Sequence, residues 1–321
     1  MRQRAEEAEG WPEVPYEEWK ETLATLHMWL QIVGKVRVAY VPWVNHQWHV
    51  TLHVTSRGLT SRPVPWDGGT FQMDFDFIDH MLHIWRSDGQ RGRLELRPRS
   101  VADFYHKLLE ELRGMGIVVE IHGMPNEVSE PIPFEENERD GEYQSKYANR
   151  FFRVLSSSTR VMEEFRGGFL GKCSPVHLFW GAMDLAVTRF SGGTAPKHPG
   201  GIPHLPDWIT REAYSHELSS AGFWPGGEAY PYPIFYSYAY PDPPGFSEAQ
   251  VSPRSARWDE GLSEFILPYE RVRAAASPEK DLMGFLESTY AAAADLGGWN
   301  RTQLEWGPGQ RPPVGGRGRE R

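Results

Sequence analysis

KCSPVHLFWGAMDLAVTRF, residues 172–190, is the most informative stretch of this sequence. From Val176 to Phe190 the apolar residues fill both alternating sets of positions, which predicts a β-strand covered by other elements on both faces. Asp184 would then be buried in mid-strand, where an ionised carboxylate is costly unless it is paired, hydrogen-bonded or bound to a metal. We interpret Asp184 either as a structural residue, satisfied by backbone amides or by Arg189, or as a ligand-binding or catalytic residue.

The segment after this strand, Ser191–Pro206, is rich in Gly and Pro and is not expected to form regular structure. Functional residues are often carried by loops that a rigid scaffold supports, so we expect an active-site loop here. A polar pair follows in a strand predicted over residues 214–224, where His216 precedes Glu217. Neighbours on a strand point to opposite faces, so these two side chains would share a site only through a bulge.

The composition indicates a globular protein whose partner is a small molecule or another protein rather than a nucleic acid. A chain of 321 residues with 40% hydrophobic residues can bury a sizeable core in one large domain or two. The formal net charge of −9 argues against non-specific nucleic-acid binding, and no apolar run approaches the roughly 20 residues of a membrane span. The single cysteine and the absence of a signal-peptide pattern lead us to expect a cytoplasmic protein. The 13 Trp residues predict an aromatic-lined cleft or interface.

Hydrophobic periodicity and helix caps predict the secondary structure. The clearest helix begins after Ser100, because Ser100 and Asp103 match a capping box and an apolar stripe follows as far as Gly114. Helices are predicted over residues 16–34, with Gly34 as the end, and over 100–114, 143–166 and 277–296. Strands are predicted over residues 35–42, 49–55, 71–77, 81–86, 93–97, 117–121, 176–190, 214–224, 234–240 and 264–271.

The order of these elements is similar in the two halves of the chain. Gly34-Lys35 corresponds to Gly171-Lys172, and the helix that follows Ser100 resembles the one that follows Ser277. We therefore predict an α+β fold with an internal duplication: two related halves, with antiparallel sheets and long helices packed on their outer faces. The expected organisation is a frayed N-terminus (1–12), a first half (13–123), a connection (124–142), a second half (143–305) and a disordered tail (306–321).

Six strings stand out as specific: NHQWHV (45–50), FDFIDH (75–80), RPRSVADFY (97–105), GKCSPVHLFWG (171–181), DLAVTRFSG (184–192) and YSHELSSAGFWPGG (214–227). With these strings the chain resembles an uncharacterised bacterial family, common in actinobacteria and known as a domain of unknown function. The resemblance covers about residues 11–305. It implies family membership with no activity attached, so it assigns no role to any residue.

A site would be assembled where the polar faces of the two halves meet, because His and carboxylate groups from different strands would converge there. The candidate catalytic residues are Asp184, His177, Arg189, His216 and Glu217. The candidate ligands of a divalent metal are His46, His49 and His80. We expect at least two residues of this combined set, Arg189 aside, to lie within about 8 Å of each other, the reach of one bridging ion or water.

Two functional hypotheses remain open. The first is an enzyme that uses His and carboxylate groups, with or without a divalent metal, on a small molecule in an aromatic-lined cleft. The second is a non-catalytic ligand-binding or structural protein, in which Trp180, Trp208, Trp224 and Tyr236 would hold a small ligand.

Overall fold

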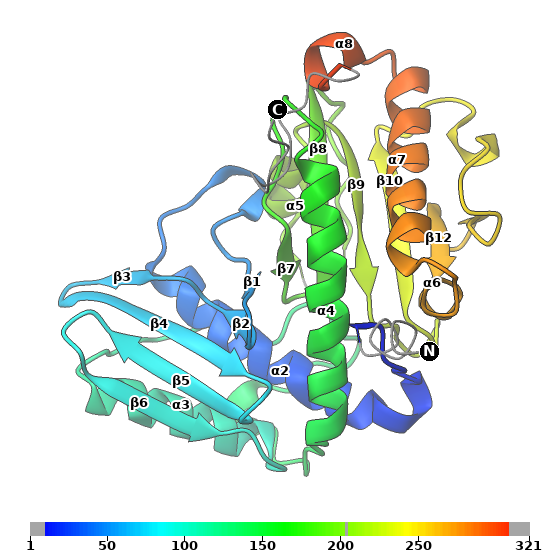
Figure 1. Cartoon of the computed structure of the whole chain (residues 1–321). Helices are drawn as coiled ribbons and strands as arrows, with labels where there is room; N and C mark the ends of the chain where they lie inside the picture. Colours follow the sequence, from blue (N-terminus) through cyan, green and yellow to red (C-terminus); the bar gives the residue numbers. More distant parts are fainter. Residues whose placement is uncertain (1–9, 203–204, 308–321) are drawn as a thin grey trace, which may run out of the picture.

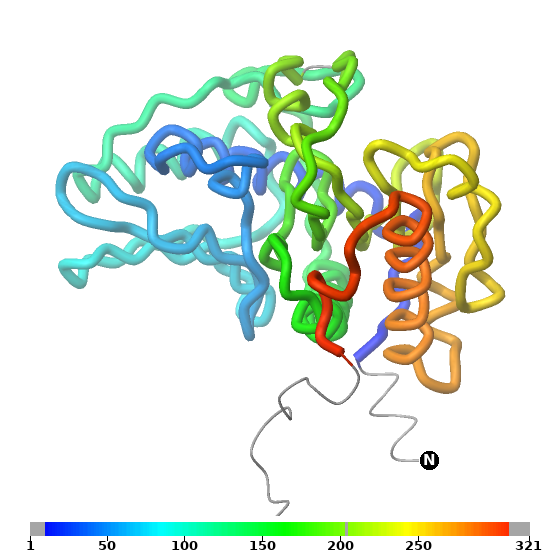
Figure 2. Tube along the Cα trace, turned by 90° about the horizontal axis from the view of Figure 1, so that it is seen from above, coloured from blue at the N-terminus to red at the C-terminus, as the bar shows by residue number. Residues whose placement is uncertain are grey.

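The computed structural model describes residues 10–202 and 205–307. These residues form an α+β protein with two antiparallel sheets of six strands each, one from each half of the chain, as predicted (Figure 1). The predictions of a frayed N-terminus and a disordered tail fall, for residues 1–9 and 308–321, outside the described residues. Most of the first half (blue to cyan) lies on one side in Figure 2, and the C-terminal segments (yellow to red) lie on the other.

The first half contains, in chain order, α2 (Tyr16–Tyr40), the 3₁₀ turn η1 (Asn45–Gln47), β1 (His53–Val54), β2 (Gly58–Thr60), β3 (Val64–Trp66), β4 (Gly69–Asp76), β5 (Met81–Arg86), β6 (Arg91–Glu95) and α3 (Val101–Gly114). The strand order of its sheet is β1-β2-β4-β5-β6, with β3 paired to β4. The connection to the second half contains only the 3₁₀ turn η2 (Phe134–Glu136).

The second half contains α4 (Ser145–Arg166), β7 (His177–Phe179), β8 (Asp184–Thr194), α5 (Asp207–Ala213), β9 (His216–Trp224), β10 (Ile234–Tyr240), the 3₁₀ turn η3 (Phe246–Glu248), β11 (Arg257–Asp259), β12 (Glu264–Pro268), α6 (Tyr269–Arg273), α7 (Pro278–Leu296) and α8 (Arg301–Leu304). The order of its sheet is β11-β12-β10-β9-β8-β7. No described helix is long and apolar enough to cross a membrane.

Local sequence signals explain the first half. The Ser100 half of the predicted capping box forms, since the Asp103 amide donates to the Ser100 hydroxyl at 3.1 Å. On β4 the alternating residues Phe71, Met73 and Phe75 are buried, whereas the residues between them face away from the core. The first sheet therefore buries one face against α2 and α3 and leaves the other polar.

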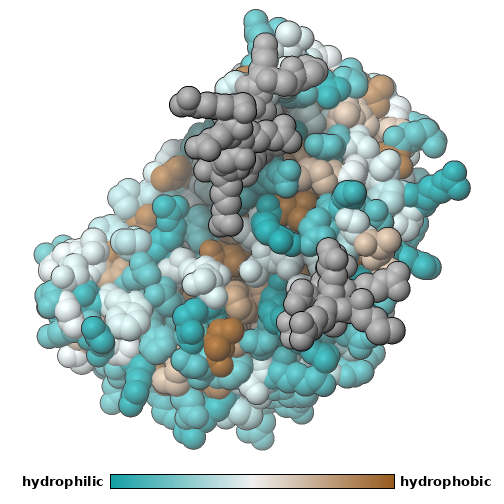
Figure 3. All heavy atoms as spheres, viewed as in Figure 1, coloured by the Kyte–Doolittle hydropathy of each residue, from teal (hydrophilic) through white to brown (hydrophobic). Residues whose placement is uncertain are grey.

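The second sheet is covered differently on its two faces. On β8, Leu185 and Val187 are fully buried on the face that carries α4 and α7. Asp184, Ala186 and Thr188 point to the opposite face, which looks towards the first half. The outer, helix-bearing side of the molecule is mostly hydrophilic, with small separate apolar patches (Figure 3). The inner face is the one that carries the candidate site.

The prediction that Gly34 ends the first helix is wrong, and so is the strand predicted over residues 35–42. Helix α2 continues to Tyr40, and Gly34 lies in its interior. A Cβ at Gly34 would lie 2.3 Å from Nε1 of Trp180, so the glycine permits close packing of the Trp180 ring on the helix. Trp180 also donates to the Val50 carbonyl at 2.7 Å, which joins the two halves at this point.

Five other predictions need correction. The strand predicted over residues 264–271 ends at Pro268, directly before α6, and β8 extends to Thr194, into the segment expected to be irregular. Residues 49–55 form only the short strand β1, preceded by a bridge between Leu52 and Leu178, and residues 117–121 form no strand. The long strand predicted over residues 176–190 is the hairpin β7–β8, whose turn contains Met183 with a φ of 63°. Asp184 therefore begins a strand rather than lying in the middle of one.

The N-terminal residues described here are packed rather than frayed. Trp11 is buried, and its ring contacts Phe235 and Tyr269 of the second half. The Tyr269 hydroxyl donates to the Pro12 carbonyl at 2.7 Å. The chain thus begins against the second sheet before it enters the first half.

Candidate functional site

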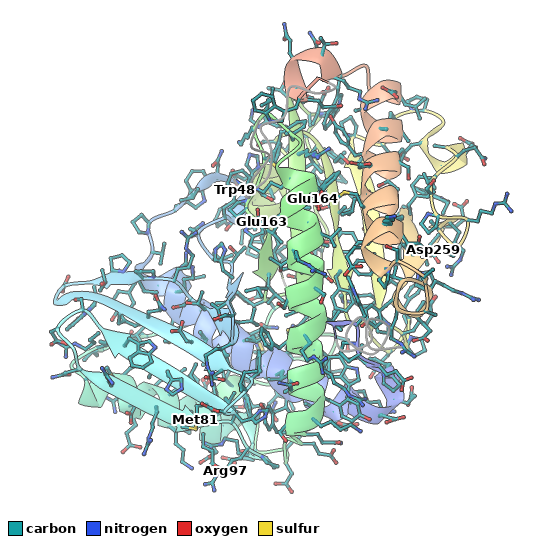
Figure 4. All side chains as sticks on the ribbon, in the orientation of Figure 1. Trp48, Met81, Arg97, Glu163, Glu164 and Asp259 are labelled. Carbon is teal, nitrogen blue, oxygen red and sulfur yellow. The ribbon has the colours of Figure 1, made fainter. Side chains whose placement is uncertain are left out.

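A cavity of about 690 Å³ lies on the inner face of the second sheet. Its floor is formed by inward-facing residues of β8, β9, β10 and β12. Its other walls come from α2, η1, α5 and the segment 120–127 that leads into the connection. Val38 and Trp208 line it and are exposed, so the cavity opens to solvent beside them. In Figure 4 Trp48, another lining residue, is labelled to the left of α4 and above the first sheet, where Met81 is labelled.

Asp184 is held in the floor of this cavity by Tyr236. The Tyr236 hydroxyl donates to Oδ2 of Asp184 at 2.5 Å, from β10 across β9. The ring can span this distance because Gly222 lies between the two strands, where a Cβ would be 2.4 Å from the Tyr236 hydroxyl. Burial raises the pKa of Asp184 to about 6.

Glu127 reaches the cavity from the connection. The side-chain amide of Gln31 exchanges two hydrogen bonds with the backbone of Asn126, which holds this part of the connection on α2. Glu127 has a φ of 55°, and its carboxyl lies against Gly181, where a Cβ would be 2.2 Å from Oε1. Glu127 as a residue is exposed to solvent at the cavity, but the protein atoms around its carboxyl still desolvate that group. Desolvation and the charge of Asp184 raise the pKa of Glu127 to about 7.

Glu264 is the third carboxyl group of the cavity, and it lies at the start of β12. Burial, followed by the charges of Asp184 and Asp259, raises the pKa of Glu264 to about 8. Within the described residues, Glu264 and Glu127 have no side-chain hydrogen bond, and none of the three carboxyls has an ion-pair partner. Two adjacent hydroxyls, those of Tyr214 and Tyr238, are bonded to each other at 2.9 Å.

Two basic groups near the cavity, Lys35 and His46, are already engaged. Lys35 Nζ donates to Oδ1 of Asn126 at 2.6 Å, and burial lowers the pKa of Lys35 to about 8. His46 bonds through Nδ1 to the Ala213 carbonyl at 2.9 Å and through Nε2 to Lys172 Nζ at 2.6 Å. Because the Nδ1 proton must go to a carbonyl, Nε2 is the acceptor and Lys172 the donor. This cluster ties η1 to α5.

Of the five candidate catalytic residues, only Asp184 lines the cavity. His177 is fully buried behind it, where Nδ1 lies 3.0 Å from the Thr51 hydroxyl and burial lowers the pKa of His177 to about 3. Arg189 is also buried, but on the helix-bearing face, with its guanidinium over the rings of Phe165 and Tyr290. The candidate catalytic residues Asp184 and Arg189 therefore do not share one cavity, because their positions in β8 differ by an odd number and their side chains point to opposite faces.

His216 and Glu217 point in different directions, as expected for neighbours on a strand. His216 Nδ1 lies 3.0 Å from the Ser215 hydroxyl, and its ring centre lies 5.8 Å from that of His46. Glu217 accepts a hydrogen bond of 2.6 Å from Ser191. The His46–His216 pair meets the expected separation of less than about 8 Å, the reach of one bridging ion or water. Neither His216 nor Glu217 lines the cavity.

The three candidate metal ligands do not converge. His46 contacts α5, and Nδ1 of His49 lies 3.1 Å from the Val44 carbonyl. His80 is in the turn between β4 and β5, where its Nδ1 lies 2.7 Å from the Tyr143 hydroxyl. Over residues 10–202 and 205–307, no three His, Cys, Asp or Glu residues are grouped so that they could hold a metal ion.

The aromatic part of the site was predicted more closely. Trp180, Trp208, Trp224 and Tyr236 all line the cavity, as do Ile202 and Leu205 of the predicted loop. Sequence reasoning missed Glu127 and Glu264, because neither lies in an apolar pattern that would indicate burial. The one available signal was the placement of Glu264 directly before the apolar run FILP, where a strand begins.

Comparison with known proteins identifies the family but no function. No curated protein and no solved structure matches this chain. The model of a family of unknown function, DUF5996, matches residues 11–306, which is most of the chain. The match includes both sheets and every wall of the cavity, so the chain belongs to the DUF5996 family.

Proposed function

We propose that this chain binds a small, largely apolar molecule in the cavity between its two halves. The observation that carries the proposal is the cavity itself. Its volume of about 690 Å³ falls within the range of small-molecule sites. Aromatic side chains from both halves line it, with a few polar groups among them, and this is the usual composition of such sites.

Imperfect packing does not account for a space of this size. Protein interiors are close-packed, and unfilled apolar volume is costly. The walls of this cavity are held by specific contacts: Tyr236 lies over Gly222, and the indole of Trp224 donates to the Ala182 carbonyl at 3.1 Å. A space with walls fixed in this way supports a ligand site.

Acid–base catalysis on the bound molecule is the second candidate function. The observation in its favour is that the pKa values of Asp184, Glu127 and Glu264 are raised to about 6, 7 and 8. Near neutral pH the site would therefore contain both protonated and ionised carboxyls, the two forms that an acid and a base require. In this proposal the enzyme uses carboxyl and tyrosine groups rather than the His and carboxylate groups expected from the sequence.

Binding can be tested with the neutral apolar dye Nile red, whose fluorescence rises in an apolar site. The unchanged protein should enhance the fluorescence saturably. Ala186→Phe should weaken binding at least about tenfold, because Ala186 faces the cavity from β8 and the added ring would fill its floor. Ala276→Phe adds the same ring at an exposed position after α6 and should leave binding unchanged. Equal binding by both variants would refute the proposal.

The net charge of −9 and the single cysteine support a small-molecule partner and a cytoplasmic location as parts of the same proposal. The internal duplication also remains a proposal. It is supported by the two antiparallel sheets, in each of which consecutive strands pair and long helices cover one face.

A further inference from the structure

We propose that the ligand of this cavity carries a protonated amine, which the carboxylates of Asp184, Glu127 and Glu264 hold while its apolar body lies against the aromatic walls. This inference rests on the proposed ligand-binding function and adds the chemical class of the ligand.

The first argument is uncompensated charge. Glu127 and Glu264 come from different segments, and both line the same cavity as Asp184. The three carboxyls therefore face one shared space. A cation placed there would interact with all of them and would favour their ionised forms. Ionised carboxylates in an apolar setting without a cationic partner are costly, and the raised pKa values of these three groups reflect that cost. An ammonium group placed between them would remove much of it.

The second argument is that no described basic residue of the cavity wall forms an ion pair with these carboxyls. Lys35 is bonded to the side chain of Asn126, and Lys172 is bonded to His46 at the η1 end. No described ion pair includes Asp184, Glu127 or Glu264. A ligand cation would supply the counter-charge that the described residues do not provide.

An independent observation on a different wall also indicates a ligand. Thr210 of α5 lines the cavity and is only 2% exposed, yet its hydroxyl has no hydrogen-bond partner among the described residues. A buried hydroxyl left unpaired costs about 1–3 kcal/mol, so such groups are normally satisfied. A polar group on the ligand would satisfy it.

The aromatic walls suit a cation with an apolar body. Tyr236 stacks on Tyr238 with ring centres 6.1 Å apart, and Tyr236 is also the residue that bonds Asp184. The negative faces of Trp and Tyr rings attract ammonium groups, most strongly where water is excluded. An anionic ligand would meet three carboxyls here and would be disfavoured.

The test uses three probes with the same indole body: tryptamine, which is a cation, tryptophol, which is neutral, and indole-3-propionate, which is an anion. Isothermal titration with the full chain at pH 8 measures all three. Tryptamine should bind at least about tenfold more tightly than tryptophol, the difference expected for one charge-assisted contact, and indole-3-propionate should bind most weakly.

Asp184→Asn should reduce the tryptamine preference to within about threefold while tryptophol affinity is kept, because the amide preserves shape and removes charge. Glu264→Gln provides a second variant, and circular dichroism checks that each is folded. Glu217→Gln is the matched control, since it removes a negative charge from the same sheet outside the cavity lining, and it should keep the preference.

Equal binding of tryptamine and tryptophol would overturn the amine assignment and leave the ligand-binding function standing. A preference that survives in both Asp184→Asn and Glu264→Gln would overturn the role of these carboxylates. Absence of binding by all three probes, together with no saturable Nile red signal, would overturn both proposals.

Discussion

Replacing Glu264 by glutamine should make the protein more stable at alkaline pH. Burial and neighbouring charges raise the pKa of Glu264 from 4.5 to about 8, so the folded state disfavours the ionised form. The folded protein therefore holds a proton that the unfolded chain releases, and stability falls as pH rises from about 4.5 to about 8. Glutamine has the same shape and never ionises, so this loss should disappear.

The full shift corresponds to roughly 5 kcal/mol for an isolated group. Glu264 is half-buried beside a cavity that opens to solvent, so screening should leave about 1–2 kcal/mol. Urea unfolding followed by tryptophan fluorescence should show this gain for Glu264→Gln at pH 8.5 and almost none at pH 5. In thermal melts at pH 8.5 the gain should be about 3 °C or more. A variant destabilised equally at both pH values would show that Glu264 makes a stabilising contact, and the reasoning would be refuted.

Three further predictions concern residues in and outside the cavity. Asp76→Asn should destabilise the protein, in contrast to Glu264→Gln, and should lower the free energy of unfolding by about 2 kcal/mol or more at pH 7. Asp76 is buried, pairs with Arg57 at 2.5 Å and has a lowered pKa, so the folded state favours its ionised form. An unchanged midpoint in urea unfolding would contradict this. Gly222→Ala should cost about 1–3 kcal/mol, since the new Cβ would displace Tyr236, and a crystal structure should show that hydroxyl moved from its aspartate partner. Thr210→Val should leave stability equal or higher by about 1 kcal/mol, as its hydroxyl is unpaired in the described structure; a clear loss in chemical denaturation would indicate an undetected partner.

The fold could be predicted from the sequence wherever the signal is local. The Ser100 cap and the alternation along β4 depend on neighbours a few residues apart, and both predictions are confirmed. The strand predicted after Gly34 is wrong, and the reason lies in tertiary packing. The run KVRVAYV alternates like a strand and follows a glycine, yet packing of Trp180 on Gly34 stabilises a continuing helix.

The candidate site divides in the same way. An apolar pattern around Asp184 and an excess of tryptophan were enough to predict a carboxylate and an aromatic-lined cleft from the sequence alone. Only the tertiary structure could show that Glu127 and Glu264 lie in the same cavity as Asp184. Glu127 and Glu264 are 137 positions apart in the sequence, and the three residues come from a loop and from the non-adjacent strands β8 and β12. The same structure removed Arg189 and His177 from the site. A strand directs neighbouring side chains to opposite faces, and the hairpin turn at Met183 sets which residues face the cavity, a choice that periodicity cannot make.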